Sequence, residues 1–209
     1  FIKIAVAELS PEFLVLARCL LAAALLLPIA ARRRALVPVL RRWKVLLAFA
    51  VAEIVLPWYA LNAAEVTLPS STTGLLLASI PLVAIGVAFL FGRRHRVTAL
   101  TVLGLLTGTA GVAAVVGLDL GGGDLGAVAL LSVAVVGYAV GPAILAKYMS
   151  DLPGIGVMAL ALAASAIIYL PIVGLTGGWP SSVPSPAVLL SVLVLAVVCS
   201  AIAFLLMFA

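Results

Sequence analysis

Runs of about 20 apolar residues recur along almost the whole chain, and they constrain its fold more than any other feature. The full runs lie at 12–30, 44–62, 70–91, 97–117, 125–147, 154–176 and 187–209, and residues 1–7 end another. Backbone groups in lipid must bond within their own segment, so such runs predict membrane-spanning α-helices. Strands of a membrane β-barrel would be half as long and would alternate with polar residues, which none of these runs does. The predicted fold class is therefore an all-α transmembrane helical bundle with about eight visible spans.

The composition excludes an ordinary soluble domain. Hydrophobic residues make up 66% of the chain and charged residues only 9%, whereas about a quarter of a soluble domain is charged. The net charge of +5 does not predict a nucleic-acid partner, because the basic residues gather in short clusters between apolar runs. Cys19 and Cys199 both lie inside apolar runs, where we expect them to pack without binding metal or forming a disulfide.

The basic clusters also predict the topology. One loop, 31–44, holds Arg32, Arg33, Arg34, Arg41, Arg42 and Lys44, and another, 92–96, holds Arg93, Arg94, His95 and Arg96. The loops on the opposite side carry Glu8, Glu12, Glu65, Asp119 and Asp124 and no lysine or arginine. Because cytoplasmic loops are enriched in basic residues, loops 31–44 and 92–96 are predicted to be cytoplasmic in the cell (inner) membrane.

The chain contains a weak internal repeat. The segment SPEFLVLARCLLAAALLLPI begins at Ser10 and LPGIGVMALALAASAIIYLPI at Leu152; both start near a proline and close on Leu-Pro-Ile. A second pair is AEIVLPWYAL from Ala52 and AIAFLLMFA from Ala201. If the first five helices form one repeat, the sixth helix of the chain begins the second repeat on the opposite side of the membrane. The two repeats are then inverted relative to each other.

Three segments point to a known family. They are FIKIAVAELSPEFLVLARCLLAA with Lys3, Pro11 and Arg18, then YALNAAEVTLPSSTTGLLLASIPLVAIGVAFLFG with Pro81, then TALTVLGLLTGTAGVAAV. They resemble the EamA-type permeases of the drug/metabolite transporter superfamily, over essentially the whole chain. The resemblance implies ten helices in two inverted halves, here 1–117 with helix one truncated and 118–209 with helices six to eight, so that the last two helices are missing. In one departure, Gly92 is followed by Arg93, where the family usually has an acidic residue.

Glu53 lies in the middle of the run 44–62, where an ionisable group is costly and hence a functional candidate. Its helical face also carries the small residues Ala50, Pro57, Ala60 and Ala64, which would admit a neighbouring helix or a cavity. Pro57 has no N–H to donate to the carbonyl of Glu53. Burial favours the neutral form of a carboxyl group, so Glu53 is either a proton carrier or a hydrogen-bonded packing residue.

Lys3 and Arg18 lie a few residues inside the outer ends of their spans. From that depth each side chain can snorkel to the membrane surface, or it can face a central cavity. The family resemblance favours the cavity, because these permeases often keep a lysine and an arginine at the corresponding places. Two cations against one carboxyl group would then favour a substrate with an anionic group.

Other candidates are weaker. Trp58, Tyr59 and Asn62 end the run 44–62, and an aromatic belt at the membrane surface is the commoner role for the first two. Tyr138 precedes Pro142 by four residues, as Glu53 precedes Pro57, and Ser79 is expected to bond its own helix backbone. Helix breaks are predicted at Pro57, Pro81 and Pro142, and Gly137 and Gly141 predict a close helix contact.

The leading functional hypothesis is a secondary transporter, either a permease or an exporter, of a small metabolite such as an amino acid or organic anion. It would work by alternating access, with proton coupling as one option. A membrane channel or a non-transporting scaffold is the alternative, although no selectivity filter or ring of charges is present. An intramembrane enzyme is least favoured, because the single histidine, His95, lies in a basic loop and no span contains an aspartate.

No catalytic residue, metal or cofactor is expected, since the chain has no nucleotide-binding motif. The expected partners are a small-molecule substrate and the lipid bilayer, with no nucleic acid, and a homo-oligomer is left open.

Overall fold

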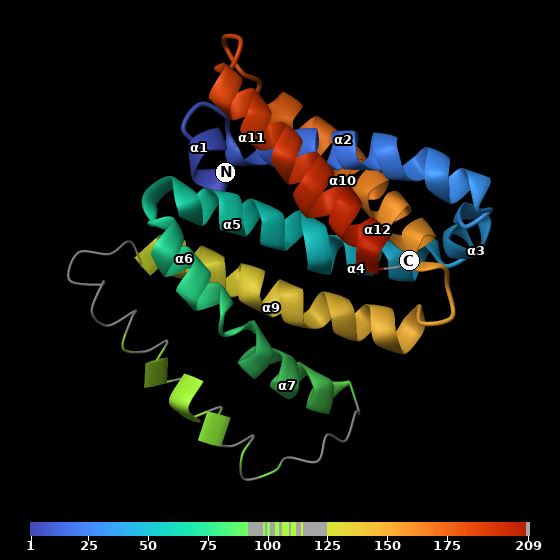
Figure 1. Cartoon of the computed structure of the whole chain (residues 1–209), viewed down its shortest axis with the longest axis vertical. Helices are drawn as coiled ribbons and strands as arrows, with labels where there is room; N and C mark the ends of the chain where they lie inside the picture. The colour runs from blue at the N-terminus through green and yellow to red at the C-terminus, as the bar shows by residue number, and fades with distance from the viewer. Residues whose placement is uncertain are drawn as a thin grey trace.

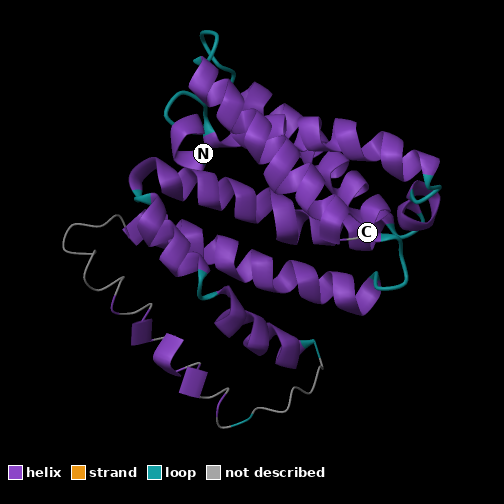
Figure 2. Ribbon diagram, in the orientation of Figure 1, coloured by secondary structure: helices purple, strands orange, loops and turns teal. Residues whose placement is uncertain are grey.

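A computed structural model of the protein describes residues 1–91, 98, 100, 103–104, 106–108, 110–111, 114 and 125–207. Throughout this part of the chain the regular elements are helices (Figure 2). They are α1 (Ile2–Ala5), α2 (Pro11–Arg32), α3 (Leu36–Leu40), α4 (Trp43–Ala50), η1 (Val51–Val55), α5 (Leu56–Thr67), α6 (Ser70–Leu77), α7 (Ile80–Leu90), α9 (Leu125–Tyr148), α10 (Gly154–Thr176), α11 (Pro186–Ala196), η2 (Val197–Ile202) and α12 (Ala203–Met207). The segments η1 and η2 are single stretches of π-helix inside longer helices.

In the described part of the chain, six stretches of helix are long and apolar enough to cross a membrane. They are Pro11–Arg32, Trp43–Thr67, Ser70–Leu90, Leu125–Tyr148, Gly154–Thr176 and Pro186–Leu206. They confirm the prediction of a multi-pass all-α membrane bundle. The predicted span at 97–117 lies largely outside the described residues, and the basic loop 92–96 lies entirely outside them.

The ends of the spans follow local signals in the sequence. Ser10 caps α2: its hydroxyl accepts a hydrogen bond from the backbone N–H of Phe13 at 3.2 Å, and Pro11 occupies the first turn. At the other end of its partner α10, Gly177 adopts a left-handed conformation with φ of 67°, which ends the helix. Local chemistry thus fixes where these two long helices begin and end.

The central contact of the bundle is between α2 and α10, which pack along each other (Figure 1). The helix α4–η1–α5 lies against this pair, and its α5 part packs along α9. Helices α6 and α7 also pack on α9, while α11 and η2 cover α2. The largest cluster of buried side chains is therefore formed by α2, α4, η1 and α10.

Two glycines allow α9 to approach the middle of the span Trp43–Thr67. A Cβ atom added at Gly137 would lie 2.6 Å from the carbonyl oxygen of Ala52 and would overlap Pro57. One added at Gly141 would lie 2.8 Å from Cβ of Glu53 and would overlap its carboxylate. The predicted close contact through this pair of glycines is confirmed, because no larger residue fits at either position.

Polar contacts join the early and late parts of the chain at both ends of the bundle. At one end, Ser10 donates a hydrogen bond to the carbonyl of Gly178 at 2.9 Å, and Ser185 N–H donates to Glu8 at 2.7 Å. At the opposite end, Arg42 binds Asp151 through both of its terminal nitrogens at 2.7 Å each. These hydrogen bonds lower the pKa of the Asp151 carboxyl group, which therefore stays ionised at neutral pH.

Of the three predicted proline breaks, the one at Pro81 occurs, because a turn just before it separates α6 from α7. At Pro57 the helix is not broken: the backbone passes through the π-helix η1, and the span Trp43–Thr67 continues. The break predicted at Pro142 is wrong, because α9 continues as one α-helix from Leu125 to Tyr148. A single missing backbone hydrogen bond is tolerated there, since close packing through Gly137 and Gly141 holds this part of the helix in place.

The glycine contact predicts a sharp size limit at position 137. We expect Gly137→Ala to lower the free energy of unfolding by about 1–3 kcal/mol, because the methyl group meets backbone that cannot move aside cheaply. Gly174→Ala is the matched control, because Gly174 lies in α10 and a Cβ atom there would meet no neighbour within 4 Å. The free energy of unfolding of this variant should be unchanged or slightly raised. Thermal unfolding of both variants in detergent measures the difference, and equal midpoints would contradict the packing described.

Candidate functional site

A π-helical turn shapes the centre of the span Trp43–Thr67. Pro57 has no N–H, so the carbonyl of Glu53 cannot receive its α-helical hydrogen bond. The backbone takes up a wider turn instead, in which the N–H of Leu56 bonds to the carbonyl of Val51, five residues earlier. Single π-turns of this kind occur frequently at functional sites. Glu53 lies inside the turn, and Trp58 lies in the first turn of α5, three residues after its end.

Arg18 is the buried cation of the bundle, with only 6% of its surface exposed. Its guanidinium carbon lies 3.9 Å from the centroid of the Trp58 ring, a close cation–π contact. One terminal nitrogen donates to the hydroxyl of Ser200 at 3.5 Å, the outer limit of a hydrogen bond, and the buried Nε has no partner. Arg18 therefore faces the protein interior, and the snorkelling alternative is wrong for this residue.

Ser200 comes from the opposite end of the chain. It lies in the second π-helical segment, η2, and its hydroxyl also donates to the carbonyl of Leu195, five residues earlier, at 2.9 Å. It is fully buried. Ser200 is not among the residues predicted from the sequence, although a hydroxyl group within an otherwise apolar membrane run was a signal for it. Arg18 thus lies between the two π-helical spans.

Glu53 packs against α9 at Gly141. Its Oε2 atom is buried and has no hydrogen-bond partner, and no cation of the described residues lies within salt-bridge distance. The small residues on the same face, including Ala60 and Ala64, are buried against α9 around Leu131. This face was predicted to admit either a neighbouring helix or a cavity, and the helix α9 fills it. The carboxyl group of Glu53 is therefore surrounded by close-packed apolar atoms.

Two tyrosines lie near these groups. Tyr138 of α9 lies within electrostatic range of both Arg18 and Glu53. Tyr169 of α10 donates a hydrogen bond to the carbonyl of Val55 at 2.7 Å, and this bond is buried. Tyr169 was not among the predicted site residues. Its hydroxyl group is a hydrogen-bond partner for the backbone carbonyl at the end of the π-turn. A tyrosine within a membrane run, away from its ends, was the signal for it.

Lys3 contacts a helix end instead of the surroundings of Arg18. Its ammonium group donates to the carbonyls of Glu65, Val66 and Leu68, at 2.7, 3.1 and 3.2 Å. These carbonyls end α5, where the helix dipole favours a positive charge. The contacts give Lys3 a capping role, and its predicted part in binding substrate stays a prediction.

The remaining candidates are spread over the bundle. Trp58 is only 5% exposed, so the aromatic-belt interpretation is wrong for it, whereas Tyr59 is 40% exposed and available to lipid. The amide of Asn62 donates to the carbonyl of Pro11 at 3.4 Å, and its buried Oδ1 has no partner. Ser79 donates to the carbonyl of Leu76 at 2.6 Å, the local backbone bond that its position predicts.

These observations define a class of protein: a multi-pass helical membrane protein with a buried, incompletely bonded arginine between its spans. Among the described residues, no group of histidine, cysteine and acidic side chains could hold a metal ion. The sequence profile of the EamA-like transporter family matches residues 1–117, more than half of the chain, and the chain belongs to that family. It is therefore a membrane transporter of the drug/metabolite superfamily. No curated protein and no solved structure shows significant similarity to it.

Proposed function

We propose that this protein is a secondary transporter, a permease or exporter, of a small metabolite that carries an anionic group, such as an amino acid or organic anion. The observation that carries the proposal is the state of Arg18, whose buried guanidinium has an unpartnered Nε and only one long hydrogen bond. Native proteins rarely leave buried polar atoms without partners, so each such atom needs an explanation. A carboxylate or phosphate of the substrate supplies the missing acceptors.

The arginine is suited to that task. Its planar fork of donors matches the two oxygens of a carboxylate, and the strength of such a pair increases away from water. Trp58 lies against one face of the guanidinium and restricts its orientation. Among the described residues, the salt bridge present joins Arg42 to Asp151, and no carboxylate forms a salt bridge with Arg18. Arg18 can therefore bind a substrate anion without first breaking an internal ion pair.

Glu53 is the proposed coupling residue. An isolated buried carboxyl group is more stable protonated than ionised, because nothing nearby compensates for the lost hydration of its charge. When water reaches the site from one side of the membrane, the proton can leave, and it can be replaced from the other side. Tyr138 lies near both Glu53 and Arg18 and is the proposed connection between the two events. Binding at Arg18 and proton exchange at Glu53 would then be coupled.

We further propose that the chain forms two inverted halves, 1–117 and 118–209, of a ten-helix carrier. Two observations support this. The central pair of the bundle, α2 and α10, is the pair that carries the sequence repeat ending in Leu-Pro-Ile. The spans that carry the second repeat pair each contain a π-helical segment, η1 in one and η2 in the other. Polar contacts close each end of the bundle, and their alternate opening would give alternating access.

The orientation is proposed from charge. Loops 31–44 and 92–96 are placed in the cytoplasm, because they contain the clustered arginines. The loop 92–96 lies outside the described residues, so the proposal rests on its sequence alone.

Glu53→Gln provides the direct test of coupling. Glutamine keeps the shape of the side chain and cannot titrate, so we expect uptake driven by a pH gradient to be lost while counterflow exchange is partly retained. The assay uses the purified protein in liposomes and a substrate selected by thermal shift from a panel of amino acids and organic acids. Infrared difference spectra should also lose a carboxyl stretching band. Undiminished pH-driven uptake by Glu53→Gln would show that the residue is structural.

Arg18→Gln tests the anion site. We expect affinity for anionic substrates to fall by roughly 10- to 100-fold, which corresponds to the loss of a buried charge-assisted hydrogen bond, while neutral analogues lose little. Arg18→Lys is the companion variant: it retains the charge without the planar fork and should recover part of the affinity. Equal losses for anionic and neutral analogues would assign Arg18 to packing.

Cysteine labelling tests the orientation. In a variant lacking Cys19 and Cys199, a cysteine at Arg33 should be protected from impermeant thiol reagents in intact cells. One at Ser181, in the loop between α10 and α11 at the opposite end, should react. The reverse labelling pattern would invert the proposed topology.

A further inference from the structure

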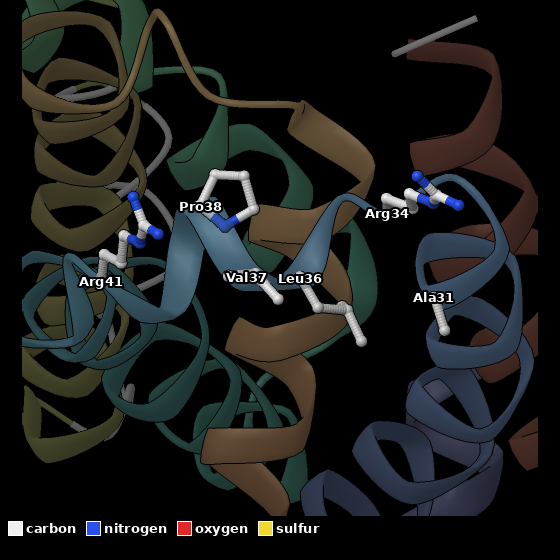
Figure 3. A pocket seen from close by; sticks show the side chains of 6 residues that line it. All are labelled: Ala31, Arg34, Leu36, Val37, Pro38 and Arg41. Atoms are coloured by element: carbon white, nitrogen blue, oxygen red, sulfur yellow. The ribbon is translucent and has the colours of Figure 1, made fainter.

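A pocket opens on the surface where α2 and α4 are joined. It has a volume of about 590 Å³ and is lined by Ala31, Arg34, Leu36, Val37, Pro38 and Arg41. Figure 3 shows the two arginines on opposite sides of the apolar residues of α3. The pocket lies between the ends of two membrane spans, Pro11–Arg32 and Trp43–Thr67, so α3 lies at the level of the membrane surface. It shares no residue with the site around Arg18.

The short helix α3 has one buried and one exposed apolar face. Val39 is fully buried, and Ala35, just before the helix, packs so closely on α10 that Gly156 has no room for a side chain. On the opposite face Val37 is 61% and Leu40 50% exposed. Apolar side chains exposed at the level of the membrane surface are suited to contact with acyl chains.

The charges at the rim of the pocket are uncompensated. Arg34 and Arg41 are both exposed, and within the described part of the chain neither guanidinium makes a hydrogen bond or an ion pair. The neighbouring Arg42 differs, because Asp151 binds both of its terminal nitrogens. The carboxylate of Asp151 is therefore already bound to Arg42, and Arg34 and Arg41 remain free to bind an external anion.

The backbone at Arg34 adopts a conformation that glycine prefers. Arg34 has a φ of 54°, in the left-handed region, at the position just after α2 that glycine usually occupies. The N–H of Ala35 bonds to the carbonyl of Ala30 at 2.9 Å, which completes the usual helix-ending motif. A non-glycine residue is disfavoured in this conformation, so glycine at position 34 would relieve backbone strain instead of introducing it.

We propose that this pocket binds the headgroup phosphate of an anionic phospholipid from the adjoining leaflet. The phosphate lies between Arg34 and Arg41, and the start of the acyl chains lies over Val37 and Leu40. The combination favours a lipid over free phosphate, because free phosphate would make no use of the exposed apolar face. Arginine forms bidentate hydrogen bonds with phosphate oxygens, and basic pockets at the ends of membrane helices are suited to lipid headgroups.

The test uses the whole purified protein in a neutral detergent, titrated with short-chain phosphatidylglycerol. Bound lipid is counted by native mass spectrometry, and the thermal midpoint is followed in parallel. We expect Arg34→Gly and Arg41→Gln each to weaken phosphatidylglycerol binding about fivefold. Arg34→Gly should keep or raise the midpoint without lipid, because glycine relieves the left-handed backbone, so a folding defect cannot explain its loss of binding.

Arg33→Gln is the matched control, since it removes the same charge from the adjacent residue, which does not line the pocket. Unchanged lipid binding by Arg33→Gln, together with losses at Arg34 and Arg41, supports the site. Equal losses of lipid binding in all three variants would show that only the net positive charge of this loop matters, and would overturn the proposal. Equal binding of phosphatidylcholine, which has the same phosphate but no net charge, would contradict the selection of an anionic lipid and overturn the proposal. Equal saturation by inorganic phosphate at the same concentration would assign the arginines to a soluble anion.

Discussion

In a bilayer each backbone polar group needs a partner within the protein, and this requirement governs the centre of the bundle. Pro57 removes one donor from the middle of a membrane span, and the chain responds with a π-turn in place of a break. The carbonyl of Val55, at the end of that turn, receives the hydroxyl of Tyr169 from a neighbouring helix. One backbone carbonyl at the end of the turn thus receives a partner from another helix, at a point where the span changes its register.

The change of register determines what Arg18 contacts. Residues after the π-turn are rotated relative to those before it, and Trp58 is the first aromatic side chain to follow. Its ring lies against the guanidinium of Arg18, which is otherwise held by a single long hydrogen bond to Ser200. A cation–π contact contributes about 2 kcal/mol when desolvated, which offsets only part of the cost of burying the charge. The remainder is a reason to expect an anionic ligand at this position.

The sequence predicted the parts of the structure that depend on length and charge. Apolar runs located the spans because the thickness of the bilayer sets their length, and Gly137 with Gly141 located a helix contact because only glycine leaves room there. The sequence did not predict which way side chains face around a helix axis. Trp58 was expected at the lipid surface and is buried, and Ser200 and Tyr169 were not singled out. An apolar run has little amphipathic pattern, so hydropathy cannot orient it, and neither π-turn has a sequence signal beyond Pro57.

The π-turns also affect how this chain is to be aligned with its relatives. A π-turn holds one residue more than the α-helical turn that it replaces, and one residue corresponds to about 100° of rotation in an α-helix. A relative without the turn would have the same hydropathy and a span of nearly the same length, yet an ungapped alignment would pair its lipid-facing residues with interior residues of this chain. Matching the two therefore requires a one-residue gap within the helix, near Val51–Val55, where alignments of membrane spans do not ordinarily place one.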